Sequence, residues 1–162
     1  GNVDSRIHQM QTADYDAIVL AASGLKRMNM LEMATEIFDP EIMLPAVGQG
    51  ILGIELIDKQ SYILDLVKKL NHEATRNAAI TERTFLIALG GGCNLPIAAY
   101  AQANKNEITI QGIFASEDGK LFAKDSIKGK VEDKRSLARK LALQLKQEIE
   151  GKKKTVLSDV IS

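Results

Sequence analysis

Residues 96–127, PIAAYAQANKNEITIQGIFASEDGKLFAKDSI, decide the fold of the second half of the chain. Two short polar segments, Asn104-Lys105-Asn106 and Glu117-Asp118-Gly119, divide this stretch into apolar runs over 96–103, 107–115 and 120–127. Asn, Asp and Gly tolerate the backbone conformations that tight turns require. The stretch therefore predicts three antiparallel strands joined by two hairpins.

Helical spacing of apolar residues flanks these strands on both sides. A helix is expected over 73–89, with its inward face formed by Ala74, Ala78, Thr81, Phe85, Leu86 and Leu89. Another is expected over 133–150, with Leu137, Leu141, Leu145 and Ile149 on one face. Gly90-Gly91-Gly92 and Gly151 are expected to end these helices. The order helix, three strands, helix predicts a small α+β domain over 69–151 and a flexible tail over 152–162.

The first half of the chain has a different pattern. Residues 16–22 form a continuous apolar run, typical of a strand buried on both faces of a parallel sheet, and residues 51–57 are a second strand candidate. Helical spacing is found over 5–13, 25–36 and 60–70. The stretch 45–53 contains one proline and three glycines and indicates a hinge or crossover. This half is predicted to be α/β.

Composition excludes several classes of protein. The 162 residues include 21 Lys and Arg and 21 Asp and Glu, so no basic excess favours nucleic acid or a membrane surface. One cysteine cannot form a disulfide framework or a cysteine-rich zinc site, and a cytoplasmic location is expected. No apolar run approaches a membrane span. Because Gly1-Asn2-Val3-Asp4 lacks an initiator Met and resembles mid-domain sequence, we expect a fragment.

Cys93 lies between Gly90-Gly91-Gly92 and Asn94-Leu95-Pro96. Glycines leave room for a bulky group to approach the sulfur, and proline fixes the path of the chain beyond it. The alternative is a small buried hydrophobic residue behind a helix stop. No histidine or basic residue adjoins Cys93, which disfavours a cysteine-nucleophile hydrolase. The residues alone leave both roles open.

Two arginines are candidate ligands for carboxylates. Arg27 follows Ser23-Gly24 just after the apolar run 16–22, and ligands bind at such strand ends in open α/β sheets. Arg6 lies near the start of the chain, and a guanidinium binds a carboxylate through two hydrogen bonds. The alternative for each is a solvated surface residue.

The remaining polar residues favour no further site. His8 and His72 lack metal-ligand spacing and are expected to be structural or surface residues, so no metal site is expected. Glu73 and Glu82 are expected on solvated faces. Gly48-Gln49-Gly50 lacks the third glycine of a dinucleotide-binding loop.

Six blocks resemble, in order and spacing, the C-terminal half of the porphobilinogen deaminases (hydroxymethylbilane synthases). These blocks are Gly1-Asn-Val-Asp-Ser-Arg6, Asp14-Tyr-Asp-Ala-Ile18, Ala22-Ser-Gly-Leu-Lys-Arg27, Leu44-Pro-Ala-Val-Gly-Gln-Gly50, Gly53-Ile-Glu55 and Leu89-Gly-Gly-Gly-Cys93-Asn-Leu-Pro-Ile97. The similarity covers about residues 1–128, with the last helix matching loosely. Ser5 and Asn94 depart mildly from it, because Thr and Gln are usual there.

The resemblance implies a specific architecture. Residues 1–50 would end a second α/β domain similar to periplasmic binding proteins, and residues 51–68 would form a hinge that returns to the first domain. Residues 69–151 would form the cofactor-bearing α+β domain, followed by the tail over 152–162.

The resemblance also implies an activity. Such transferases join four porphobilinogen molecules, each losing ammonia, into the linear tetrapyrrole hydroxymethylbilane on a dipyrromethane primer. A thioether to the cysteine that matches Cys93 holds this cofactor. Arg6 and Arg27 match carboxylate-binding arginines, while Gly24 and Gln49 lie in matching segments that would line the cleft or hinge.

The same resemblance implies what this chain lacks. The family's acid/base aspartate belongs to an N-terminal half, so no catalytic residue is expected here and the chain alone would be inactive. Its partners would be porphobilinogen, the growing pyrrole chain and that N-terminal half, and the full-length enzyme would be a monomer. The alternative is a non-catalytic module that binds a small carboxylate and has a structural Cys93.

Overall fold

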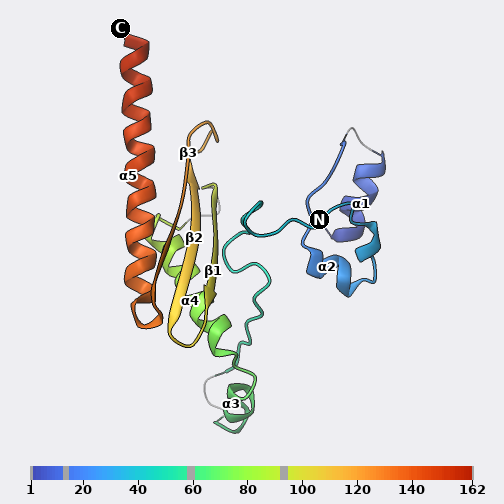
Figure 1. Ribbon diagram of the computed structural model, residues 1–162. Coiled ribbons are helices and arrows are strands. Elements are labelled where there is room, and N and C mark those ends of the chain that lie inside the picture. Colours follow the sequence, from blue (N-terminus) through green and yellow to red (C-terminus); the bar gives the residue numbers. More distant parts are fainter. Residues whose placement is uncertain (1, 13–14, 58–60, 92–94, 162) are drawn as a thin grey trace. The chain divides into compact units, whose positions relative to one another are not determined.

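The computed structural model describes residues 2–12, 15–57, 61–91 and 95–161, with only the backbone described at 61 and 154–161. The chain forms two compact units, Gly1–Asp39 and Pro40–Ser162, and each is described by itself (Figure 1).

The first unit contains three short helical elements: α1 (Val3–Thr12), α2 (Ala22–Arg27) and the 3-10 helix η1 (Leu31–Met33). Ile7 and Leu25 are its buried apolar residues in the described part. Gly24 of α2 lies against Val3 of α1, since a Cβ added to Gly24 would be 3.5 Å from Val3 Cγ2. The helix expected over 5–13 is confirmed as α1, which begins two residues earlier; residue 13 lies outside the described residues.

The helix expected over 25–36 is much shorter than predicted. Asn29 has φ +55°, a left-handed conformation in which Asn is more common than most residues. Its N–H bonds the Lys26 carbonyl and the Met30 N–H bonds the Leu25 carbonyl, at 3.2 and 2.9 Å. This pair of bonds is a Schellman motif, which closes the carbonyl end of α2. The helix consequently ends at Arg27.

The second unit contains the predicted sheet. Its strands are β1 (Ile97–Ala103), β2 (Glu107–Ala115) and β3 (Phe122–Lys130), antiparallel in the order β1-β2-β3. In the first hairpin, Asn104 Oδ1 accepts the N–H groups of Asn106 and Glu107. In the second, Gly119 adopts φ +70°. Both predicted hairpins are confirmed.

Helices α4 (Glu73–Ala88) and α5 (Lys134–Ile161) pack on this sheet, and the short helices α3 (Ser61–Lys68) and η2 (Val131–Asp133) precede them (Figure 1). Several sheet residues in the core are alanine, namely Ala99, Ala101 and Ala123, which lets the helices approach closely. The buried core includes Phe85, Ala99, Ile110, Ala123, Leu141 and Leu145. Side chains of the predicted inward faces thus form the core, as expected from the 3.6-residue period.

Both ends of α4 are capped. The His72 imidazole accepts the Thr75 N–H at the first turn, which gives this histidine a structural role. At the other end, the Gly90 N–H bonds the Ile87 carbonyl and the Gly91 N–H bonds the Leu86 carbonyl. Gly90 has φ +101°, so this is a second Schellman motif and the predicted glycine stop is confirmed.

The expectation that Gly151 ends the last helix is wrong, because α5 runs from Lys134 to Ile161. Gly151 is not among the glycines with positive φ and so does not adopt the left-handed C-cap conformation. Lys152 Nζ donates to the Phe122 carbonyl at 2.8 Å and pairs with Glu148 at 2.6 Å. These bonds hold the turn after Gly151 against β3 and offset the poor helix propensity of glycine.

The strands expected over 16–22 and 51–57 are absent, since both segments have irregular backbone up to the start of α2 and up to residue 57. Val19 is 63% exposed and Leu52 88% exposed, so neither run is buried on both faces. A strand requires neighbours that satisfy its backbone hydrogen bonds, and the sheet formed by the described residues pairs only β1, β2 and β3. Neither run joins it.

Residues 44–48 pack against the sheet of the second unit. Leu44 is buried, Val47 packs on the core, and the Pro45 carbonyl accepts the Ala99 N–H at 3.2 Å. The boundary between the compact units therefore lies at residue 39, before the expected boundary at residue 50. How these units relate to whole-protein domains stays a prediction.

Candidate functional site

Arg6 and Arg27 come from adjacent helices of the first unit. Arg6 lies one turn after Val3 on α1, and Arg27 lies one turn after Gly24 on α2; a Cβ added to Gly24 would lie 3.5 Å from Val3 Cγ2. Residues three apart share a helix face, so both arginines are near this contact. Both are exposed, and neither pairs with a carboxylate of the described residues. Two guanidinium groups are thus open to an anionic ligand.

Gly24 occupies a helical position where a side chain would be tolerated. The contact of its added Cβ with Val3, at 3.5 Å, is an ordinary van der Waals distance. Its φ lies outside the left-handed region. The local geometry of α2 therefore does not demand glycine, and a requirement for it would have to come from a ligand.

Gln49 lies at the centre of two overlapping turns in the second unit. Its N–H bonds the Ala46 carbonyl at 3.0 Å, and the Ile51 N–H bonds the Gly48 carbonyl at 3.2 Å. Gly48 and Gly50, each third in its turn, have φ of +75° and +78°, the signature of type II turns. We call residues 46–51 the double turn. It presents the exposed Gln49 side chain at its tip.

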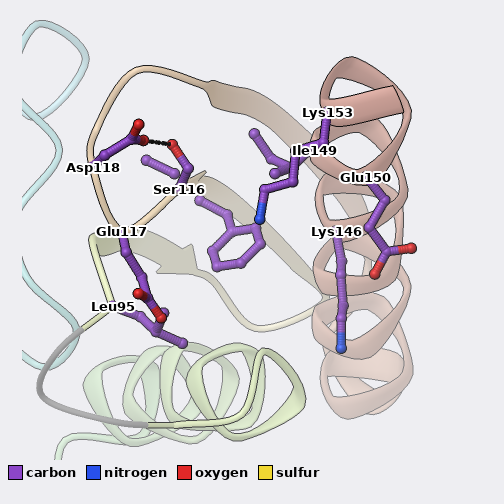
Figure 2. A pocket seen from close by; sticks show the side chains of 10 residues that line it. Leu95, Ser116, Glu117, Asp118, Lys146, Ile149, Glu150 and Lys153 are labelled. Carbon is purple, nitrogen blue, oxygen red and sulfur yellow. Dashed lines mark hydrogen bonds between the residues drawn. The ribbon is translucent and has the colours of Figure 1, made fainter. Parts of the chain in front are cut away.

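Cys93, the expected attachment point of the cofactor, lies outside the described residues, as do its neighbours 92 and 94. The described chain resumes at Leu95, which lines a hollow of about 510 Å³ between α5 and the 116–120 turn. Figure 2 shows Lys153 extending from α5 into this hollow, with Ser116 and Asp118 bonded to each other across from it.

The charges around this hollow are mixed. Lys146 and Lys153 share its lining with Glu117, Asp118 and Glu150. The hydrogen bond from the Ser116 hydroxyl lowers the pKa of Asp118 below its ordinary value, aided by the Lys120 backbone N–H. Three acidic side chains at the rim do not suit a polyanionic ligand, because like charges repel. The hollow therefore does not extend the carboxylate site expected around the arginines.

Glu82, expected on a solvated face, is instead only 3% exposed. Its Oε2 accepts the Gly48 N–H and its Oε1 accepts the Ala101 N–H, both at 2.8 Å. Burial raises the pKa of this carboxyl above its ordinary value, and the two backbone N–H donors oppose that shift by less. The missed signal was spacing, since Glu82 lies four residues after Ala78 and three before Phe85 on the inward face.

The described residues show neither a metal cluster nor a membrane helix. No group of three or more His, Cys, Asp or Glu side chains lies together there. None of the helices in this part of the chain has the length and apolar character needed to span a bilayer.

Two family models match consecutive parts of the chain. Residues 1–65 match the dipyromethane cofactor binding domain of porphobilinogen deaminase, so dipyrromethane is the cofactor that this domain binds in the family. Residues 77–147 match the C-terminal domain of the same enzyme. Arg6, Gly24, Arg27 and Gln49 lie in the first match, and Cys93 lies in the second.

Curated relatives have the same name. The porphobilinogen deaminase of Prochlorococcus marinus (strain NATL1A) is 39% identical over 152 residues, which are 94% of this chain and 47% of the relative. That of Bacillus subtilis (strain 168) is 44% identical over 131 residues, 80% of this chain and 42% of the relative. The chain thus spans about half the length of the curated relatives it matches. On these matches, the chain belongs to the porphobilinogen deaminase family.

Proposed function

We propose that this chain is the C-terminal part of a hydroxymethylbilane synthase, which joins four porphobilinogen units into a linear tetrapyrrole. Each addition forms one carbon–carbon bond between pyrrole units and releases one ammonia. The observation that carries the proposal is the consecutive match of 1–65 and 77–147 to two domains of one enzyme family. The match to the cofactor binding domain precedes the match to the C-terminal domain along this chain.

The unpaired arginines supply the binding chemistry. Every pyrrole unit of such a chain carries carboxylates, and charge-assisted bonds from planar guanidinium groups are the strongest that neutral-pH side chains offer them. Arg6 and Arg27 are exposed, come from touching helices and have no carboxylate partner among the residues described. These features fit a polyanionic cofactor and product. Gly24 lies in the same matched segment and would line the cleft.

We assign Cys93 as the covalent anchor of the dipyrromethane, through a thioether at its sulfur. When bound, dipyrromethane supplies the primer to which new pyrrole units are added. The anchor would come from the C-terminal domain, and the guanidinium groups from the cofactor binding domain. On this arrangement both parts of the chain hold the same cofactor.

The proposal extends to the rest of the protein. An N-terminal half would supply the acid/base aspartate, and residues 1–50 would complete an α/β domain similar to periplasmic binding proteins. The full-length enzyme would act as a cytoplasmic monomer, and this chain alone would be inactive. The exposed apolar runs 16–22 and 51–57 support the proposal of an N-terminal half, because sheet partners from another segment would bury them.

Intact mass spectrometry of the full-length holoenzyme tests the assignment. We expect an adduct of two linked pyrrole rings, located on Cys93 by peptide mapping and absent from Cys93→Ser, which cannot form a thioether. Ammonia release from porphobilinogen should be lost in the same variant. An unmodified Cys93 in an active full-length enzyme would overturn the cofactor assignment. A protein that binds small carboxylates but releases no ammonia would instead indicate a non-catalytic binding module.

A further inference from the structure

Glu82 joins three segments of the second unit. It projects from α4, accepts the Ala101 N–H of β1 through Oε1, and accepts the Gly48 N–H of the double turn through Oε2. Its carboxyl is buried and forms no ion pair with a basic residue in the part of the chain that the structure describes. Each carboxylate oxygen thus accepts one backbone N–H group, and these two donors come from different segments.

The strand that Glu82 contacts is an edge strand. In the order β1-β2-β3, β1 pairs only with β2 among the described strands, so its outer N–H groups have no sheet partner in the described part of the chain. Ala99 and Ala101 are two residues apart and so point their N–H groups to the same side. The Pro45 carbonyl accepts the first of them and Glu82 accepts the second. Residues 45–48 and Glu82 thus cover this edge together.

The double turn depends on that cover for its position. Its two internal bonds use the N–H groups of Gln49 and Ile51, which leaves the Gly48 N–H for Glu82. Val47 packs against the core on the same side. No other side chain of the described residues hydrogen-bonds residues 46–51. The place of Gln49 relative to the sheet is therefore set by Glu82, Val47 and the Pro45 carbonyl.

We infer that Glu82 is a positioning residue of the pyrrole-binding cleft: it fixes the double turn on the C-terminal unit so that Gln49 meets the ligand in one place. This inference rests on the proposed function for what Gln49 binds. The attachment of the double turn by Glu82 does not depend on the proposed function, because it can be measured without any ligand.

Glu82→Gln keeps the side-chain volume but removes one of the two hydrogen bonds that Glu82 accepts. An amide has one acceptor oxygen, so one of the two N–H donors must lose its bond. Ala101 is held in place by the ladder with β2, whereas Gly48 belongs to a turn, so we expect Gly48 to lose its bond. The neutral amide also avoids the cost of burying a charge, which favours a folded variant.

Hydrogen exchange in the full-length holoenzyme tests the attachment. We expect the Gly48 amide to exchange about tenfold faster in Glu82→Gln, the effect of losing one hydrogen bond of ordinary strength. Glu73→Gln is the matched control, because Glu73 lies on the same helix but is exposed and bonds only Asn71. Unchanged Gly48 exchange in folded Glu82→Gln would overturn the inference.

Steady-state kinetics test the consequence for the cleft. We expect Glu82→Gln and Gln49→Ala each to raise KM for porphobilinogen by about tenfold, with the double variant no worse than Gln49→Ala alone. Multiplied effects would overturn a positioning role, because they would show that Glu82 acts independently of Gln49.

Two further results keep the test decisive. If Glu82→Gln does not fold, Val47→Ala is the second variant, because it removes packing that holds the same turn. A raised KM together with faster Gly48 exchange in Val47→Ala would support the inference. No change in either quantity would overturn it. If the wild type releases no ammonia, the proposed function fails by itself. Faster Gly48 exchange in Glu82→Gln would then still support the attachment.

Discussion

Among the described glycines, Gly112 is the one whose added Cβ would make the shortest contact. A Cβ built there would lie 2.5 Å from Cζ of Phe85, whose ring is completely buried. The clash involves a rigid aromatic ring in the centre of the core, and a ring cannot move aside as the end of a flexible side chain can. The close approach of α4 to β2 therefore requires glycine at this residue.

We predict that Gly112→Ala destabilises the full-length protein by about 1–3 kcal/mol, the usual cost of overpacking a core. Urea denaturation measures this change. Gly151→Ala is the control, because no atom lies within 4 Å of a Cβ added there and its backbone is not left-handed, so we expect no loss of stability. Replacing Phe85 with Leu in the Gly112→Ala variant should recover part of the loss. Equal effects of the two alanine variants would contradict the contact.

Single residues differ in how far their role can be inferred from the sequence. Arg6 and Arg27 could be proposed as ligands for anions because a guanidinium group is positively charged and donates hydrogen bonds in any sequence context. The role of Glu82 could not be deduced from its type, since glutamate on a helix is usually solvated. Only its place on the apolar stripe of α4 indicated burial, and its two N–H donors come from segments distant in sequence.

Elements with strong local signals were predictable. The three strands and two hairpins follow from apolar runs separated by turn-forming Asn, Asp and Gly, and the observed bounds differ by at most a few residues. Helix ends were less predictable, because they depend on one residue's backbone conformation. Asn29 ends α2 early by adopting φ +55°, whereas Gly151 lets α5 continue. Residue type alone does not distinguish these two outcomes.

The helix α5 offers a direct test of its continuation. A Cβ added at Gly151 would have no atom within 4 Å, and the backbone there is not left-handed. Because alanine favours the helix more than glycine does, we predict that Gly151→Ala stabilises the protein by about 0.5–1 kcal/mol. Gly90→Ala is the matched comparison and should destabilise it by at least a similar amount, since Gly90 has φ +101° at a helix end. Thermal denaturation of both variants measures these changes. A loss of stability in Gly151→Ala would show that the helix ends there.

At the scale of the whole molecule, the two halves of the chain differ in what local sequence can decide. Residues 73–161 carry their own sheet and its two covering helices, so the second-half architecture follows from its sequence. The runs 16–22 and 51–57 are apolar enough for buried strands but pair with no described strand. Strand formation depends on non-local partners, which a run of residues cannot specify. The same holds for the proposed pyrrole-binding cleft.

Carboxylate binding by Arg27 can be tested in the full-length protein. We predict that Arg27→Leu lowers kcat/KM for porphobilinogen about 10- to 100-fold, the loss expected for one charge-assisted bond, and stalls pyrrole-chain elongation. Arg27 is exposed, so stability should change by less than about 0.5 kcal/mol. Lys26→Leu, which removes a neighbouring exposed charge from α2, should keep normal turnover. Native mass spectrometry would show accumulated intermediates only in Arg27→Leu; normal intermediates and turnover in that variant would contradict carboxylate binding by Arg27.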